Sequence, residues 1–595
     1  MTDGKGGKAI RIIPFVNSRV KSLWPYIAII AAVFYVYFRT LFFGFVWLDD
    51  NVLILDNQWF LHSLAHAGQS FTREIFNTHG PASYYRPLLT LSLILDAQFG
   101  GTAPFMYHVT NMLLHMAASC LVFAFLTTFG VKRHVAFALT LVFCVHPVLA
   151  QAVAWIPGRN DSLLALFALP AMIALMRYWQ SGNMRYLLGH GLFFTLALFT
   201  KESMALFPFV GTVWILLYVV SSDSGQSRST AVRALLENGS RITSLFITWL
   251  LPGILWAVLR KIALANPIHY TAGEAIKSLF KNAPALLLYL GKTVLPFNLE
   301  ALPTLQDSSQ AYGYIALGAG AMLIAAAFTR YIRTNDKGSS SGNRLSPASA
   351  VFFGLLWFLL FLVPSLVQPD ASSDALFFEH RIYVPLVGLL LVAAQARFVR
   401  ELDLRRVSAW IALGCCVYFF SVITRQHVGI FSDRIVFYET AVKYAPRHPF
   451  GHKNLGAIYQ LEGKIDLAEK EDLATLQLNP YEAMIHNNLG LIYQLKGDTL
   501  KARQEFDKEL AINPNYALAH FNLGRLRYTC GQKKDAEKLW LKTLELEPDY
   551  IDAMKYLCVY YHEISDTTHE RRFSMELINR GIPWTADSAA KSAVK

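Results

Sequence analysis

The sequence predicts an all-α protein in which a bundle of membrane-spanning helices precedes a solenoid of helical repeats. Three observations predict this fold class. Hydrophobic residues make up 54% of the 595 positions and charged residues only 16%, a composition too apolar for an ordinary soluble protein. Apolar runs of about 18 residues or more recur between Trp24 and Thr424. Beyond residue 440, several residue types recur every 34 positions.

The chain divides into four predicted parts. Residues 1–23 form a cytoplasmic N-terminal segment, in which no short apolar region precedes a small-residue cleavage site. Residues 24–432 form the membrane domain, residues 433–580 form the repeat domain, and residues 581–595 form a C-terminal tail. The first span is therefore expected to be retained in the protein.

Eleven segments of about 20 residues are candidate spans. They are residues 24–44, 104–129, 135–157, 161–178, 186–200, 203–220, 242–260, 312–331, 348–366, 383–398 and 407–424. Basic residues cluster in alternate loops, and cytoplasmic loops are the ones that carry excess Lys and Arg. This places the N-terminus in the cytoplasm and the repeat domain on the opposite side. Residues 276–298 would reverse the sign of every later loop if they crossed, so we expect them to lie in the outer membrane interface.

The positive charge belongs to the membrane domain. The formal net charge of the chain is +12, but residues 433–595 hold 22 Lys and Arg against 23 Asp and Glu. The excess therefore lies in the loops between spans, where it sets orientation, and it does not indicate nucleic acid. The expected partner of this half is membrane lipid.

Several classes of chemistry lack support. The six cysteines show no disulfide framework and no metal-binding spacing. The sequence also has no Walker loop, no G-x-S-x-G elbow and no H-E-x-x-H motif. Nothing here indicates nucleotide hydrolysis or serine hydrolase chemistry.

The repeats have the period of tetratricopeptide repeats. Proline recurs at Pro446, Pro480, Pro514 and Pro548, and leucine recurs at Leu455, Leu489, Leu523 and Leu557. Small residues keep the same phase at Gly456, Gly490 and Gly524 and at Ala468, Ala502 and Ala536. Small residues let two helices touch, and proline ends the second helix of each pair. Three full repeats and a degenerate fourth are expected.

Polar residues also keep the period, at Asn454, Asn488 and Asn522. A buried position would favour apolar residues, so these asparagines are candidates for a ladder that bonds the backbone of an extended peptide. His452, His486 and His520 share the period. The alternative is local, namely that these side chains cap or bond the neighbouring repeat.

Two adjacent carboxylates, Asp49 and Asp50, follow the first span. Carboxylates at a membrane face are costly unless they contact water, a cation or a substrate. They are therefore the catalytic candidates, because either can accept a proton from a hydroxyl group. The alternative is a solvated loop start or a helix cap.

Four cations fall on the outer side, where loop statistics predict few. They are Arg86, Arg159, Lys201 and Arg381. An anionic phosphate at the membrane surface would explain them. The alternative is local ion pairing of Lys201 with Glu202, of Arg159 with Asp161 and of Arg381 with Glu379.

Four histidines are candidates for either a substrate contact or a structural role. His108, Asn111 and His115 lie on one face of the second predicted span, where metal ligation competes with interhelical hydrogen bonding. His146 precedes a proline and suits a turn that ends a span. Glu202, Glu379 and His380 stand beside the candidate cations and are kept with them.

The order of these motifs resembles a known family. The acidic pair is followed by YYRP, YHVTNMLLH, HPVLAQAVAWIPGRND, FTKES and EHRIYVP, and then by the 34-residue repeats. This order is similar to that of the transmembrane and tetratricopeptide-repeat O-mannosyltransferases, which belong to the GT-C class of polytopic glycosyltransferases. The likeness covers nearly the whole chain.

The resemblance implies inverting transfer of a sugar, mannose or another hexose, from a polyprenyl-phosphate sugar to Ser or Thr of an exported protein. It implies that Asp49 or Asp50 is the loop acid, that Arg86, Arg159, Lys201 and Arg381 contact the donor phosphate, and that the repeats present the acceptor. A divalent metal is left open, because two carboxylates need further ligands. One departure is Gln151, where we expect many relatives to carry Glu.

Two alternatives remain beside this function. The acceptor can be a lipid or a glycan, or the chain can be a membrane-anchored repeat scaffold without catalytic activity. The non-cytoplasmic side is either the periplasm or the lumen of the endoplasmic reticulum. The short repeat array and the lack of an evident signal peptide favour a bacterial inner membrane.

Overall fold

A computed structural model describes residues 18–76, 84–222, 235–264, 271–334, 345–368 and 375–580, together with Pro267, Ile582 and Trp584. The predicted N-terminal segment and C-terminal tail lie largely outside these residues. The described part of the chain contains helices and no strand. It forms two compact units, residues 1–440 and 441–595. The predicted all-α fold class is therefore confirmed.

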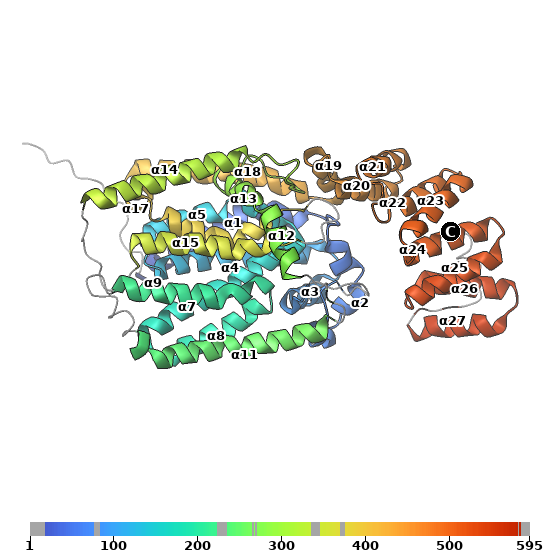
Figure 1. The fold of residues 1–595 in the computed structure, drawn as a ribbon, viewed down its shortest axis with the longest axis horizontal. Helices are drawn as coiled ribbons and strands as arrows, with labels where there is room; N and C mark the ends of the chain where they lie inside the picture. The colour runs from blue at the N-terminus through green and yellow to red at the C-terminus, as the bar shows by residue number, and fades with distance from the viewer. Residues whose placement is uncertain are drawn as a thin grey trace, which may run out of the picture. The chain divides into compact units, whose positions relative to one another are not determined.

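The first unit is a bundle of apolar helices (Figure 1). Its principal helices are α1 (Ser18–Tyr37), α3 (Pro87–Gly100), α4 (Pro104–Thr128), α5 (Arg133–Cys144), α6 (Ala150–Ala154), α7 (Arg159–Ser181), α8 (Met184–Leu198), α9 (Phe207–Ser222), α11 (Gly239–Ala263), α12 (Ala272–Asn282), α13 (Ala285–Val294), α14 (Ala311–Thr334), α15 (Pro347–Leu362), α16 (Tyr383–Ala393) and α18 (Val407–Val428).

Seven helices in the described residues are long and apolar enough to cross a membrane, or eight if the bent pair Arg133–Cys144 and Pro147–Ala154 is one span. This agrees with a multi-pass membrane protein. Each of the eleven predicted spans coincides largely with helix. Three of the eleven are not among these eight. Helices α8 and α16 have only 15 and 11 residues, and part of α14 lies among residues whose side chains the structure does not describe.

The helices differ in how much of their surface other helices cover. In the span Ile156–Ser181, which contains α7, 72% of the most apolar 18-residue stretch is buried inside the protein. In α11 only 6% of the corresponding stretch is buried. Because α11 is apolar on every side, its uncovered surface fits contact with lipid chains. Close packing inside the bundle uses glycine. A Cβ atom on Gly354 of α15 or on Gly388 of α16 would collide with the backbone carbonyl of the other.

One end of the bundle carries the longest loops and several short helices. Figure 1 shows α2 (Gln58–Leu61), α3 and α12 at this end. An apolar cluster that includes Leu53, Phe60 and Leu93 packs the first loop against α3. Residues 276–298 form parts of α12 and α13 and do not form one long helix.

The second unit is a stack of helix pairs, and it confirms the predicted tetratricopeptide repeats. The pairs are α20 (Pro449–Leu461) with α21 (Ile465–Leu478), α22 (Ile485–Leu495) with α23 (Thr499–Ile512), α24 (Ala517–Thr529) with α25 (Lys533–Leu546), and α26 (Ile551–Glu563) with α27 (Thr567–Asn579). Gly463, Gly497 and Gly531 adopt φ values of 72°, 81° and 80° in the turns within the first three pairs, a conformation that glycine adopts without steric cost.

The helix contact of the first repeat differs from that of the next two, in which a glycine faces an aromatic ring. A Cβ atom on Gly490 or Gly524 would meet the ring of Phe506 or Trp540, whereas one on Gly456 would meet the carboxylate of Asp472. Asp472 is 0% exposed, and within the described chain neither of its oxygens has a hydrogen-bond partner. Burial, with a smaller contribution from Glu471, raises the pKa of Asp472 to about 8. The first repeat is therefore held together less well than its sequence period indicates.

We predict that Asp472→Leu stabilises the first helix pair. The folded-state pKa of Asp472 lies above its unfolded value, so the stability of the wild-type pair falls as pH rises from about 4 to about 8. The gain at pH 8 should be about 2 kcal/mol or more, since one pKa unit is worth about 1.4 kcal/mol, and it should shrink at pH 5. Hydrogen exchange of residues 449–478 measures it. Phe506→Asp, at the matching position of the next repeat, should destabilise, and slower exchange in that variant would contradict the argument.

Candidate functional site

The two acidic residues lie in a strained turn that follows the first span. Trp47 adopts φ 60°, a left-handed conformation that is costly for a bulky side chain. The Asp50 carboxylate accepts a hydrogen bond from the Val46 backbone N–H at 2.7 Å, and Asp50 is 1% exposed. Asp49 stays partly exposed. The turn therefore buries Asp50 and leaves Asp49 accessible.

A helix distant in sequence holds this turn. The Tyr438 hydroxyl donates to the Trp47 carbonyl oxygen at 3.0 Å, and the Arg434 guanidinium lies 4.4 Å from the centre of the Trp47 ring. Both residues belong to α19 (Arg434–Tyr444). A strained residue persists only where its surroundings hold it, and α19 provides that restraint.

The environment raises the pKa of both carboxyl groups towards neutral pH. Burial and, to a smaller extent, the charge of Asp50 together raise the pKa of Asp49 to about 7, and Arg86 opposes this rise. Burial also raises the pKa of Asp50 to about 7, against the hydrogen bond from Val46. A carboxyl group with a pKa near the working pH can both take and release a proton, which suits a general base.

Four side chains from three distant segments form a group that we name the cation cluster: Arg86, Lys201, His380 and Arg381. Arg86 directly precedes α3, and Lys201 follows α8. His380 and Arg381 lie in the short helix η9 (Glu379–Ile382). Burial lowers the pKa of His380 well below its usual value, and the charges of Lys201, Arg381 and Arg86 lower it further. His380 is therefore neutral, and the three cations surround it.

Two carboxylates pair with the cation cluster. Lys201 Nζ lies 2.7 Å and 2.9 Å from the two oxygens of Asp161, and His380 Nε2 lies 3.9 Å from the same group. Arg86 Nε lies 3.3 Å from Glu202. The Arg86 and Lys201 side chains remain 19% and 17% exposed. Three permanent or near-permanent cations thus face two carboxylates at a partly open site, so an anion that reaches it is attracted.

The predicted pairing of sequence neighbours is wrong for all three candidate pairs. Lys201 pairs with Asp161, and Glu202 pairs with Arg86. Arg381 donates to the Leu376 carbonyl at 2.9 Å. Adjacent residues point in different directions from a helix end, so the partners come from other segments.

Arg159 has a structural position. It is 0% exposed, and its Nη1 lies 2.5 Å from Asp96 Oδ2. Its Nε donates to Asn111 Oδ1 at 2.7 Å, and its Nη2 donates to the Tyr107 carbonyl at 2.7 Å. All three guanidinium nitrogens bond to protein groups. The expected pairing with Asp161 is absent, and the geometry leaves no exposed donor for the predicted phosphate contact.

A buried network fixes the segment that carries His380 and Arg381. Glu379 is 0% exposed and lies 2.8 Å from Lys292 Nζ and 2.8 Å from His427 Nε2. Burial opposes ionisation of Glu379, but Lys292 and His427 outweigh it and hold the pKa at about 2. Lys292 also contacts Glu300 at 3.3 Å. Glu379 therefore anchors η9 and does not pair with Arg381.

Gln151 orients His380. Its side-chain oxygen accepts from the His380 backbone N–H at 3.1 Å and lies 3.2 Å from His380 Nδ1. The Trp155 ring lies 5.2 Å from the His380 ring. A neutral His380 that carries its proton on Nδ1 donates a hydrogen bond to the Gln151 side-chain oxygen. Its other ring nitrogen, Nε2, is then directed towards Asp161.

Two of the other candidate histidines, His115 and His146, form hydrogen bonds within the bundle, whereas neither ring nitrogen of His108 has a hydrogen-bond partner among the described residues. His115 Nδ1 lies 2.6 Å from the Tyr383 hydroxyl, and its Nε2 lies 3.1 Å from the Cys144 carbonyl, which is interhelical hydrogen bonding. His146 Nε2 lies 2.9 Å from the Thr293 carbonyl, and its Nδ1 accepts from Val148 N at the turn after α5. His108 is 1% exposed and packs against Phe43.

The periodic asparagines do not form one exposed ladder. Asn522 is 2% exposed and donates to Asn487 Oδ1 of the preceding repeat at 2.9 Å. Asn454 donates to the Phe450 carbonyl of its own helix at 2.7 Å. Asn454 and Asn488 are partly exposed. The local alternative therefore describes Asn522, whereas Asn454 and Asn488 remain reachable from outside.

The histidines of the same phase also bond locally. His452 lies 2.7 Å from Glu471, and His486 lies 2.6 Å from Glu505. His520 Nε2 lies 2.9 Å from the Pro514 carbonyl. His452 and His486 each tie the two helices of one pair together, and His520 ties its helix to the segment that precedes it.

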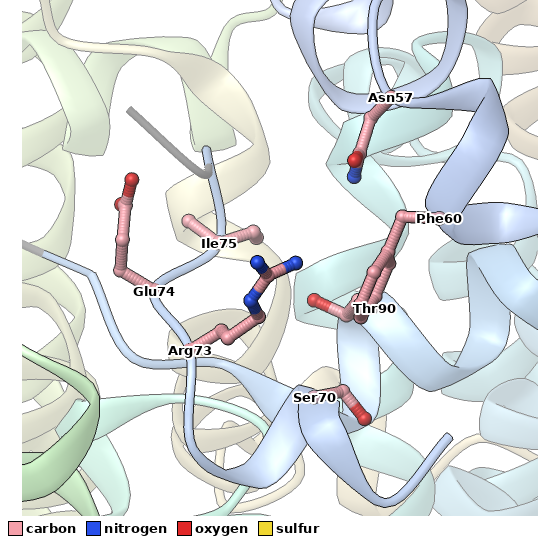
Figure 2. Close-up of a pocket in the computed structure, with 7 residues that line it drawn as sticks. All are labelled: Asn57, Phe60, Ser70, Arg73, Glu74, Ile75 and Thr90. Carbon is pink, nitrogen blue, oxygen red and sulfur yellow. The ribbon is translucent and has the colours of Figure 1, made fainter. Parts of the chain in front are cut away.

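A small pocket in the first loop lies apart from the predicted site residues. Its lining residues are Asn57, Phe60, Ser70, Arg73, Glu74, Ile75 and Thr90. Figure 2 shows Arg73 extending into the space between Asn57 and Thr90. The cavity has a volume of about 10 Å³ for a water-sized molecule. It can hold one water molecule and is too small for a sugar. Among the described residues, no three His, Cys, Asp or Glu side chains lie close enough together to hold a metal ion.

The chain is similar to curated protein O-mannosyl-transferases. It is 30% identical to the human protein O-mannosyl-transferase TMTC2 over 174 residues, which are 28% of this chain and 21% of that protein. It is 38% identical to mouse TMTC1 over 99 residues, 16% of this chain and 10% of that protein. The chain thus matches about a fifth or less of the length of these relatives. The predicted resemblance is confirmed, and these two matches cover 28% and 16% of the chain rather than nearly all of it. No protein-family model matches the chain.

Partial likenesses to two solved structures are also found. The first tetratricopeptide repeat domain of Spaghetti (RPAP3), bound to an HSP90 peptide, is 23% identical and covers 22% of this chain and 93% of that one, with a TM-score of 0.18. MamA is 19% identical and covers 27% of this chain and 93% of that one, with a TM-score of 0.24.

We predict that Arg159→Met destabilises the membrane unit by about 3–5 kcal/mol, because it leaves Asp96 buried without its cation. The double variant with Asp96→Leu should recover most of this loss, since both charges are then removed. Thermal unfolding of the detergent-solubilised protein measures both. Unchanged stability in the single variant would show that Arg159 is not a structural residue.

Proposed function

We propose that this chain is a membrane glycosyltransferase that moves a sugar, mannose or another hexose, from a polyprenyl-phosphate sugar to Ser or Thr of an exported protein. One observation carries the proposal: Asp49, a partly exposed carboxyl group with a pKa of about 7, lies close enough to Arg86 of the cation cluster for that charge to lower its pKa. The similarity to curated O-mannosyl-transferases supports the same class of enzyme.

The proposed reaction uses Asp49 as the base. The acceptor hydroxyl oxygen attacks the anomeric carbon of the donor sugar, its proton passes to Asp49, and the bond from that carbon to the phosphate oxygen breaks. The electron pair stays with the polyprenyl phosphate. Attack from the side opposite the leaving group inverts the anomeric centre. Arg86, Lys201 and Arg381 stabilise the charge on the departing phosphate.

The position of the cation cluster suits a lipid-linked donor. Arg86, Lys201 and Arg381 follow or precede apolar helices, so they lie at helix ends and not at the middle of a span. A polyprenyl chain stays in the membrane while its phosphate stays at the surface. We assign this end of the bundle to the non-cytoplasmic side, because the basic loops between spans favour that orientation.

The repeat unit is proposed to present the acceptor. An acceptor bound by a tethered repeat array reaches the active site at a raised effective concentration. Asn454 and Asn488 are the proposed contacts to the acceptor backbone, because both are partly exposed on the first helix of a repeat. Asn522 is left with a structural role through its bond to Asn487.

We predict that Asp49→Asn lowers the turnover number by about 100-fold or more, because the amide cannot accept the proton. The KM for the donor should change little. Transfer of labelled sugar from a polyprenyl-phosphate sugar to a Ser/Thr peptide measures both constants in purified protein. Asp56→Asn, in the same loop but exposed, is the matched control and should retain activity.

The same assay tests the whole assignment. Undiminished transfer in the Asp49→Asn, Asp50→Asn double variant would refute it. Transfer to a lipid or glycan by a chain lacking residues 441–595, with no transfer to peptide by the full chain, would instead identify the other acceptor class. A chain that binds exported proteins but transfers no sugar would be a scaffold.

The proposed base also predicts the pH dependence. Only ionised Asp49 accepts a proton, so kcat/KM should rise with pH and level off above about 7. Arg86 lowers the pKa of Asp49, so Arg86→Met should shift this acid limb to higher pH in addition to weakening donor binding. A limb that stays in place in Arg86→Met, measured from pH 5 to 9, would contradict the assignment of Asp49.

A further inference from the structure

Helix α12 is too short to cross a membrane but lies at the end of the bundle that carries the cation cluster. It has 11 residues, Ala272–Asn282, whereas a span needs about 20. Its start is fixed by a capping box, in which Thr271 and Glu274 satisfy each other's backbone N–H groups. Figure 1 shows it beside α13, at the same end as α3.

Helix α12 buries two polar side chains and exposes two large apolar ones, which is unusual for a helix on a soluble protein. Ser278 and Asn282 are 7% and 2% exposed, whereas Ile276 and Phe280 are 55% and 74% exposed. A surface helix in water buries its apolar stripe and exposes its polar one. Since the opposite holds here, the medium outside α12 is not expected to be water alone.

The buried polar side chains have specific partners. Asn282 Nδ2 donates to the Leu366 carbonyl at 2.8 Å, and Gln368 N donates to the Ser278 hydroxyl at 2.8 Å. These bonds fix the rotation of α12 about its axis. The exposure of Ile276 and Phe280 is therefore a built feature and does not result from loose docking.

Charge accompanies the exposed apolar pair. Each helical residue advances by about 100°, so Ile276 and Phe280 share one stripe and Lys277 and Lys281 form the adjacent stripe. Both lysines are exposed. An apolar stripe bordered by lysines is the pattern of helices that lie in a lipid interface, where lysine contacts anionic head groups.

Neighbouring segments place α12 near the membrane surface. The lipid-facing helix α11 ends at Ala263, only eight residues before Thr271. Gln368, whose backbone N–H bonds to Ser278 of α12, also connects α12 to the cation cluster. The side chains of Gln368, through Nε2, and of Arg381, through Nη1, both donate to the Leu376 carbonyl, at 3.1 Å and 2.9 Å. A continuous series of hydrogen bonds therefore connects α12 to Arg381.

We propose that α12 is a lipid-binding helix that lies in the head-group layer of the membrane. Ile276 and Phe280 insert among the acyl chains, and Lys277 and Lys281 contact the phosphates of anionic phospholipids. This inference concerns a surface, and it stands whether or not the chain transfers a sugar.

A depth measurement tests the proposal. Phe280→Cys is labelled with an environment-sensitive fluorophore in full-length protein in which the exposed Cys415 and Cys530 are replaced by Ser. The protein is placed in nanodiscs that contain phosphatidylcholine, phosphatidylglycerol and a lipid with a quencher high on its acyl chain. Quenching by roughly half or more is expected, because interfacial helices sit about 5–10 Å below the head groups. Tyr481→Cys, 78% exposed in the repeat unit, is the matched control and should not be quenched.

Each other outcome overturns the proposal. Quenching of the label at position 280 by aqueous iodide, as strong as at position 481, would place α12 in water. Protection from both quenchers would indicate a second copy of the chain on this face. The Lys277→Gln, Lys281→Gln variant should lose its preference for phosphatidylglycerol over phosphatidylcholine in lipid co-purification, and an unchanged preference would remove the role of the lysines.

Discussion

The high cost of burying charge is the constraint on which this structure depends. A buried ion is stable only when another ion and several hydrogen bonds satisfy it. At one end of the bundle, Arg159 meets Asp96, Lys201 meets Asp161, and Lys292 meets Glu379. Each pair joins segments that are distant in sequence. The need to pair buried charge therefore also ties together the loops that build the candidate site.

The candidate base, Asp49, is exposed because the backbone at Trp47 is strained and helix α19 holds it in that conformation. The left-handed backbone at Trp47 turns the chain so that Asp50 is buried while Asp49 stays accessible. Tyr438 and Arg434 hold that turn from α19, the helix that leads towards the repeats. Two identical neighbouring side chains thus acquire different environments, and only Asp49 is reachable from outside.

Much of the candidate site was predictable from residue type and order. The first loop acid and the cations at helix ends stand out because charge is rare in so apolar a chain. Asp161 is predicted only as a partner for Arg159, and Lys292 is not among the predicted site residues, although a single lysine within the apolar run 285–297 is a signal of a buried ion pair. Arg159 could not be told from the other cations, because an arginine in sequence carries no mark of its burial.

Local composition indicates where the helices of this protein lie and how apolar they are. Apolar runs and a 34-residue period depend on local composition, and these are the features that the helices of both units reproduce. Three other properties are set by packing in three dimensions: which charges pair, which aspartate is exposed, and which side of α12 faces outwards. Those properties depend on contacts between segments up to hundreds of residues apart, and no local pattern records which segments will meet.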